Sequence, residues 1–307
     1  MSNTDTEKTE DVVISTSSDL SGSDLSKSVF SHSELKESNL QNANLSECQF
    51  KTSVLPKMNI TGANLTGASF VKVDLTLTNF DEVNLTGVVF EDSNLTGTDF
   101  RKAKIDRTQF IKADLNTANF EDADCYDVKV IASKLIGANL SNAKFKASDF
   151  NQSKIEKSVC QNADFTESFM NGLVVKESNM VAANFTKADL AKASFSIVDI
   201  VGAVFNSATL TGLYSIEINA KHCDFSETDL SDASFFQSSL NDAKFVNAAL
   251  KNAVFENIDL RGADFTGAAL EGVLFKECDV EGALFDRAGM ENAEFIETDI
   301  TKANKCD

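Results

Sequence analysis

Large apolar residues recur at every fifth position along most of the chain. The series begins at Leu20, ends at Ile300 and never loses its frame, which gives 57 positions that we call centres. The residue two before a centre is usually small, and the residue one before it is mostly Asn or Asp. Examples of the small position are Ala63, Ala113, Ala143, Ala188, Ala243 and Ala293, and examples of the polar position are Asn44, Asn94, Asp114, Asn139 and Asp264.

A period of five matches neither an α-helix nor a simple strand, so the pattern predicts a structural repeat. Three of the five residues can be extended, with the small and central side chains on one side and the polar one on the other. Thirteen of the 14 glycines lie two residues after a centre, where a type II-like corner requires positive φ. Of the 24 phenylalanines, 22 are centres and the exceptions are Phe169 and Phe236. The pattern predicts short extended segments that bend every five residues and enclose the apolar side chains.

The repeating units resemble those of the pentapeptide-repeat proteins, whose motif is A(D/N)LXX. Asn-Leu-Thr-Gly follows Ala63, Asp-Phe-Thr-Gly follows Ala263, and the resemblance covers about 285 residues. It implies an all-β fold, a right-handed quadrilateral parallel β-helix with four pentapeptides, or 20 residues, in each coil. The 57 centres would then make about 14 coils, a rod roughly 70 Å long at about 4.8 Å per layer. The family binds partners and is not known for catalysis.

The repeat predicts one elongated domain over residues 18–304. Residues 1–17 are expected to form a flexible acidic segment or a cap, and 305–307 a tail. Within the domain, phenylalanine occupies two opposite walls in a block at about 18–125, and the other two walls in a block at about 145–304. The exchange of walls falls between Cys125 and Met180, where the centres are least regular. Two blocks joined in tandem or a hinge would both explain it.

The formal net charge of −19 is unevenly distributed. Residues 224–299 hold 17 acidic and five basic residues, a net charge of −12, whereas residues 101–157 hold 11 basic and eight acidic residues, a net charge of +3. Direct nucleic-acid binding is disfavoured, because phosphate contacts depend on Lys and Arg. An acidic surface favours solubility or a basic protein partner. Neither a membrane span nor a signal peptide is predicted, so we expect a cytoplasmic protein.

The residues that could carry chemistry are accounted for by the repeat. Five of the six cysteines replace apolar or small inward residues, so buried thiols are expected in place of disulfides or metal ligands. These are Cys48, Cys125, Cys160, Cys223 and Cys278, while Cys306 lies in the tail. His32 and His222 are predicted at exposed corners. A rod with a filled interior offers no cleft, so we expect no enzyme activity, cofactor or metal.

Candidate contact residues are apolar side chains at outward positions. Residues 213–222 break the pattern, with bulk moved from the centres to the small positions, and the outward Tyr214 and Ile216 lie one coil from Phe236. Such columns are typical of contact patches, although incidental surface hydrophobicity also produces them. Two secondary columns are Ile111 over Ile131, with Tyr126 nearby, and Val181 over Val201.

The leading functional hypothesis is a non-catalytic protein-interaction scaffold, an acidic rod that binds a protein partner through its outer faces. The resemblance implies an alternative, a DNA mimic that binds DNA gyrase and protects it from quinolones. Against it, such relatives commonly carry a C-terminal dimerising helix and loop insertions, whereas here residues 302–307 follow the last repeat directly. A secreted bacterial effector is a third possibility. We expect a monomer or an end-to-end homodimer.

Overall fold

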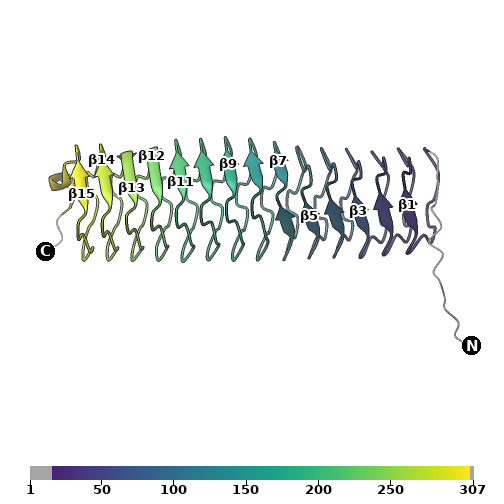
Figure 1. Ribbon diagram of the computed structural model, residues 1–307, viewed down its shortest axis with the longest axis horizontal. Helices are drawn as coiled ribbons and strands as arrows, with labels where there is room; N and C mark the ends of the chain where they lie inside the picture. Colours follow the sequence, from purple (N-terminus) through teal and green to yellow (C-terminus); the bar gives the residue numbers. More distant parts are fainter. Residues whose placement is uncertain (1–15, 305–307) are drawn as a thin grey trace, which may run out of the picture.

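The computed structural model describes residues 16–304, which form one parallel β-solenoid. Residues 20 positions apart lie side by side on adjacent coils, as in the pair Phe30 and Phe50, so the described residues make 13 to 14 coils. The molecule is a straight rod with the two ends of the chain at opposite ends (Figure 1). The expected N-terminal segment falls outside the described residues up to residue 15, as does the tail at 305–307.

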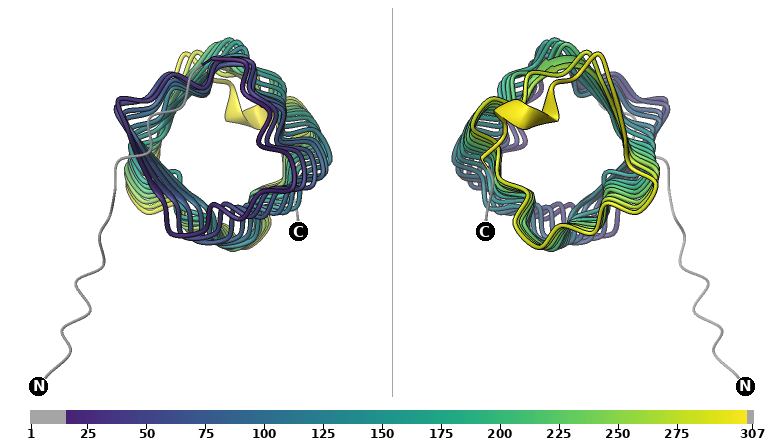
Figure 2. Two further views of the ribbon diagram at one scale, coloured as in Figure 1. Left: turned by 90° about the vertical axis from the view of Figure 1, so that its right-hand side faces the viewer. Right: turned by 90° about the vertical axis from the view of Figure 1, so that its left-hand side faces the viewer.

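The solenoid contains two parallel sheets, each on one wall of the rod. The six-stranded sheet comprises β1 (Val29–Ser31), β2 (Gln49–Lys51), β3 (Ser69–Val71), β4 (Val89–Glu91), β5 (Gln109–Ile111) and β6 (Lys129–Ile131). The nine-stranded sheet comprises β7 (Lys134–Ile136), β8 (Lys154–Glu156), β9 (Val174–Lys176), β10 (Ser194–Ser196), β11 (Tyr214–Ile216), β12 (Ser234–Ser239), β13 (Val254–Asp259), β14 (Leu274–Lys276) and β15 (Glu294–Ile296). A 3-10 helix, η1 (Ile300–Lys302), follows at the C-terminal end of the tube (Figure 2). The remaining walls are joined by isolated parallel bridges between residues 20 apart.

Every corner of the solenoid is made in the same way. Each residue two after a centre, from Ser17 to Glu297, has a positive φ between 47° and 73°. The 13 glycines predicted at this position adopt it, and so do 44 other residues. A non-glycine residue in this left-handed region costs about 1–2 kcal/mol, less for Asn and Asp. The corner is therefore fixed by the repeat as a whole, and glycine only makes it easier.

The corners differ in how their backbone N–H groups are bonded. At most corners the third residue after the centre donates to the carbonyl of the centre, as Ala103 does to Phe100 at 3.0 Å. At the corner after β5, the N–H of Ala113 instead donates to the hydroxyl of Ser133 on the next coil, also at 3.0 Å. Serines at inward positions on the strand walls thus replace a missing turn hydrogen bond, because a buried N–H needs a partner.

The interior is filled by the centres, which stack on one another along the rod. Phe90 stacks on Phe70 at 5.0 Å and on Phe110 at 5.2 Å, and Phe80 of the opposite wall meets it edge-on at 5.9 Å. Both arrangements are favourable for aromatic rings. The ring of backbone seen end-on in Figure 2 therefore encloses a packed core of buried side chains.

The phenylalanine walls change between Phe120 and Phe145, whose rings lie 5.9 Å apart at 60°. From Phe145 onward the stack continues on a different wall, with Phe165 at 5.7 Å. The sheet changes wall in the same coil, because β6 ends at Ile131 and β7 begins at Lys134. Figure 1 shows the result, with β1 to β5 along one side of the rod and β7 to β15 along another.

Candidate functional site

The three leading contact residues come together on the outer face of the nine-stranded sheet. The register pairs Ile216 of β11 with Phe236 of β12, and the rings of Tyr214 and Phe236 lie 5.6 Å apart at 44°. Tyr214 is 46% exposed, while Ile216 and Phe236 are half-buried. We call these three residues the aromatic patch.

The aromatic patch exists because β11 inverts the usual distribution of bulk. The centre of this strand is Ser215, which is fully buried and donates its hydroxyl hydrogen to the carbonyl of Ser234 at 3.0 Å. Leu213 and Ile218 fill the space from the neighbouring small positions and are each 3% exposed. Since side chains alternate along a strand, Tyr214 and Ile216 then face outward.

Ile197 extends the aromatic patch, and our sequence analysis missed it. Its N–H donates to the carbonyl of Ile216 at 3.0 Å, and its side chain is 49% exposed. Its φ is 56°, which is a strained conformation for a β-branched residue. The sequence carried a signal, because Ile197, Thr52 and Thr117 are the β-branched residues among the described corners.

Carboxylates surround the aromatic patch on its C-terminal side. An open groove of about 410 Å³ is lined by Tyr214, Ile216, Phe236, Gln237, Glu256, Asn257 and Glu277. Lys276 lies 2.6 Å from Glu256 and 3.8 Å from Glu277. The hydrogen bond to Glu256 raises the pKa of Lys276, so this lysine is held in its charged form. The groove therefore has an apolar floor and a rim with more negative than positive charge.

The secondary candidates form two smaller columns on other parts of the surface. Ile111 and Ile131 are paired in register between β5 and β6. Tyr126, which is 52% exposed, belongs to the preceding corner. Val181 and Val201 occupy equivalent corner positions on adjacent coils, because the N–H of Ala182 donates to the carbonyl of Val201 at 2.9 Å.

Two exposed apolar side chains stand apart from these columns. Leu77 is 54% exposed and Phe169 is 53% exposed, and neither was among the predicted contact residues. Phe169 takes the place of the usual Asn or Asp and is bridged to Asp149 and Asp189 on the two adjacent coils. We use both residues below as controls for the aromatic patch.

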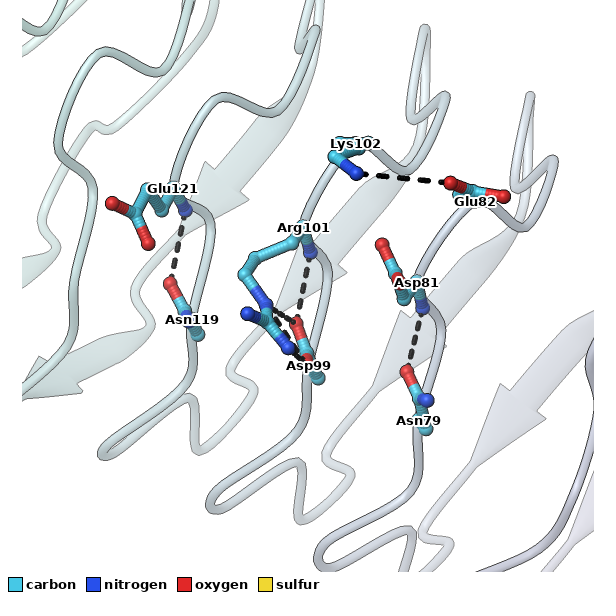
Figure 3. Close-up of polar contacts among 8 residues, drawn as sticks. All are labelled: Asn79, Asp81, Glu82, Asp99, Arg101, Lys102, Asn119 and Glu121. Atoms are coloured by element: carbon cyan, nitrogen blue, oxygen red, sulfur yellow. Dashed lines mark hydrogen bonds and ion pairs between the residues drawn. The ribbon is translucent and has the colours of Figure 1, made fainter.

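Polar side chains at the corners are engaged in local hydrogen bonds, as Figure 3 illustrates. Asn79 and Asp99 accept the N–H of the residue two positions later, at 2.8 and 3.0 Å. Arg101 also donates to both carboxylate oxygens of Asp99, and Lys102 lies 3.8 Å from Glu82 on the neighbouring coil. Burial alone would raise the pKa of Asp99, but the hydrogen bonds from Arg101 outweigh it and lower that pKa. These groups support the corners.

The five described cysteines are buried free thiols. Burial raises the pKa of Cys160 and Cys223 to about 12 and the pKa of Cys48 and Cys278 to about 11. A thiol with such a pKa is neutral and a poor nucleophile at neutral pH. Within residues 16–304, no three His, Cys, Asp or Glu side chains gather into a group that could hold a metal ion. In the same range, no helix has the length and apolar character to cross a membrane.

Solved structures of several repeat proteins resemble the rod. HetL from the cyanobacterium Nostoc sp. strain PCC 7120, described as involved in heterocyst differentiation regulation, is 20% identical over 73% of this chain and 88% of its own, with a TM-score of 0.37. Full-length QnrB1, a plasmid-mediated fluoroquinolone resistance protein, is 20% identical over 77% and 90%, with a TM-score of 0.21. A pentapeptide repeat protein of the Arabidopsis thaliana thylakoid lumen is 24% identical over 45% and 69%, with a TM-score of 0.15.

Family models give the assignment. No curated protein matches the chain. The model described as "pentapeptide repeat region" matches residues 63–140 and 216–285. The model described as "pentapeptide repeats (8 copies)" matches 16–51, 123–159, 133–172, 158–196 and 178–212. Since these matches together span most of the solenoid, the chain belongs to the pentapeptide-repeat family.

Proposed function

We propose that this protein is a non-catalytic scaffold that binds a protein partner through the outer face of the nine-stranded sheet, at the aromatic patch. The observation that carries the proposal is the contact of Tyr214 with Phe236 at positions that face solvent. Large aromatic side chains grouped in an exposed patch are typical of the residues that dominate binding energy. The strained and exposed Ile197 beside them points the same way, because strain is kept where function requires it.

The shape of the molecule supports binding over catalysis. The interior is occupied by stacked side chains, and the acidic and basic groups at the corners are bonded to neighbours on a convex surface. Catalytic sites need a pocket that excludes water and shifts pKa values. We also propose a cytoplasmic location, in keeping with thiols retained at core positions.

A capture experiment tests the proposal. The double variant Tyr214→Ser and Phe236→Asn removes the aromatic patch, and Phe169→Asn is the matched control because it removes an equally exposed aromatic ring elsewhere. We expect the wild type and the control to retain the same directly cross-linked partner, identified by mass spectrometry, and the double variant to lose most of it. Retention of that partner by a correctly folded double variant would exclude the aromatic patch.

A second candidate function is a DNA mimic that binds DNA gyrase, favoured by the acidic residues 224–299. Here Asp259 and Asp279 are bridged on adjacent coils, so carboxylates repeat along the rod at about 4.8 Å. Arg261 lies 2.6 Å from Asp259 and 3.8 Å from Asp279, which reduces the negative potential of this column. Inhibition or protection in a gyrase supercoiling assay would support the mimic, and no effect at micromolar protein would exclude it.

A further inference from the structure

The outer face of the nine-stranded sheet is divided into three zones along the rod. The first zone, over β7 to β9, carries the outward residues Lys134, Lys154 and Lys176. The middle zone, over β10 to β13, is apolar and contains the aromatic patch together with Ile197 and Val254. The third zone, over β13 to β15 and the corners after them, carries Glu256, Glu277, Glu294 and Glu297. The three zones lie in line on one side of the rod (Figure 1).

The charges at the two ends of this face are only partly neutralised by their neighbours. Lys134 and Lys154 are paired in register on adjacent strands, and neither forms an ion pair with another described residue. At the other end, Glu294 and Glu297 are likewise outside the ion pairs of the described chain, whereas Glu256 and Glu277 share Lys276. A basic end and an acidic end thus flank an apolar centre.

The length and periodicity of this face fit an α-helix laid along the rod axis. From β7 to β15 there are eight steps between adjacent strands, which at about 4.8 Å each span roughly 38 Å, the length of about 26 helical residues. One helical turn rises about 5.4 Å, close to the spacing of one coil, so successive turns stay nearly in step with successive coils over the apolar zone. Strand addition does not apply here, because the exposed surface is the face of the sheet and not its edge.

We propose that this face docks an amphipathic α-helix of a partner protein, parallel to the rod axis, with an acidic end over β7 and β8 and a basic end over β14 and β15. The inference rests on the proposed function and deepens it by naming the chemistry of the partner. Charge complementarity at both ends fixes the direction of the helix, and the apolar face of the helix covers the aromatic patch. Ile197 contacts the helix, which explains its retention in a strained corner.

The first test uses designed peptides of 26 residues and the full-length protein. One peptide has glutamates in its first two turns, an apolar stripe in the middle and lysines in its last two turns. The control peptide has the same composition and the same stripe, with glutamates and lysines interleaved at both ends. We expect the bipolar peptide to bind about tenfold more tightly in fluorescence anisotropy at low salt, with the difference shrinking as salt screens the charges. Equal affinities would overturn the proposal.

The second test changes the protein. In the double variant Lys134→Glu and Lys154→Glu, the bipolar peptide should bind about tenfold more weakly, and a peptide with lysines at both ends should recover the loss. Both lysines are exposed, so the fold should be unaffected. A variant that binds the bipolar peptide as well as the wild type does would contradict the predicted direction of the helix.

Ile197→Gly separates binding from stability. Glycine tolerates the left-handed corner, so the variant should melt about 2–4 °C higher while binding the bipolar peptide several-fold more weakly. Leu77→Gly is the matched control, because Leu77 also has a positive φ of 57° and is exposed, but lies far from this face. It should gain stability with unchanged binding. If Ile197→Gly binds the peptide as the wild type does, Ile197 makes no contact with the helix and the proposal is wrong in that part.

The two proposals can fail separately. If the capture experiment loses its partner with Tyr214→Ser and Phe236→Asn but the two peptides bind alike, the aromatic patch is an interaction site and its ligand is not a bipolar helix. If the bipolar peptide is preferred but no cellular partner depends on the patch, the chemistry of the face is right and the proposed function is wrong.

Discussion

Positive φ at one residue in five is the smallest requirement of this structure. Glycine meets it without strain at 13 corners, and polar residues such as Asn42 and Asp122 meet it at modest cost. The residues just before each corner reduce that cost, because Asn or Asp before the centre accepts the N–H of the residue after it, as Asn79 does from Asp81. The corner is therefore encoded twice, by φ preference and by a side-chain hydrogen bond.

At the same scale, the inward cysteines should be chemically silent. With Cys306→Ala, a thiol reagent at pH 8 should give no reaction with the folded protein and five equivalents after denaturation, because burial raises the pKa of the five remaining thiols. Absorbance of the released thiolate measures both. Rapid labelling of any of the five in the folded protein would show that its wall opens.

At the scale of elements, the two kinds of corner decide which wall carries regular strands. The strand walls lack the turn hydrogen bond at several corners and use an inward serine, such as Ser133 or Ser238, as a bond acceptor between coils. Alanine would fit the same space. The hydroxyl is thus retained for the N–H of the coil before it, and this could not be deduced from the period of five alone.

Ser133→Ala should therefore cost more than an equivalent serine deletion elsewhere. It removes the acceptor of the Ala113 N–H, and a buried N–H without a partner costs about 1–3 kcal/mol in the free energy of unfolding. Ser168→Ala is the control: Ser168 is equally buried, but the N–H of Ser148 that it serves also donates to the carbonyl of Phe145 at 3.2 Å. Denaturant unfolding of both variants gives the comparison, and equal losses would mean that the hydroxyl of Ser133 has no special role.

At the scale of the whole molecule, acid should destabilise the rod. The pKa is lowered for Asp259 by hydrogen bonds from Arg261, which outweigh burial, and for Asp19 and Asp24 by the residue two positions later. A folded pKa below the ordinary 3.8 stabilises the protein above that pH, and the contribution is lost as pH falls through the folded value. Protonation of other carboxylates relieves the repulsion of a net charge of −19, an opposite effect that is complete once they are neutral.

We expect the melting temperature, followed by circular dichroism, to change little or rise from pH 7 to about pH 4.5 and then to fall between about pH 4 and pH 2. Asp259→Asn should make the fall shallower, since asparagine keeps an acceptor and loses the titrating group. A melting temperature that keeps rising below pH 4 would show that repulsion dominates. Added salt at pH 7 should raise it, because salt screens the acidic surface.

Much of the fold could be predicted because each repeat carries its own instructions. The frame of the centres, the glycine corners and the pairing of residues 20 apart follow from local chemistry repeated 57 times. The inverted bulk of residues 213–218 and the adjacency of Ile216 and Phe236 followed from the same frame. Ile197 was missed because it was judged as a corner residue and not as a neighbour of Ile216.

The sequence by itself determined that the chain coils with a corner every five residues, since only that conformation buries every centre while leaving the polar residue before it in water. Only the tertiary structure decided that regular strands pass from one wall to another between Ile131 and Lys134, and that charged and apolar residues of nine strands align on one face. The physical reason is that both features depend on hydrogen bonds and side-chain contacts between coils, which no single repeat contains.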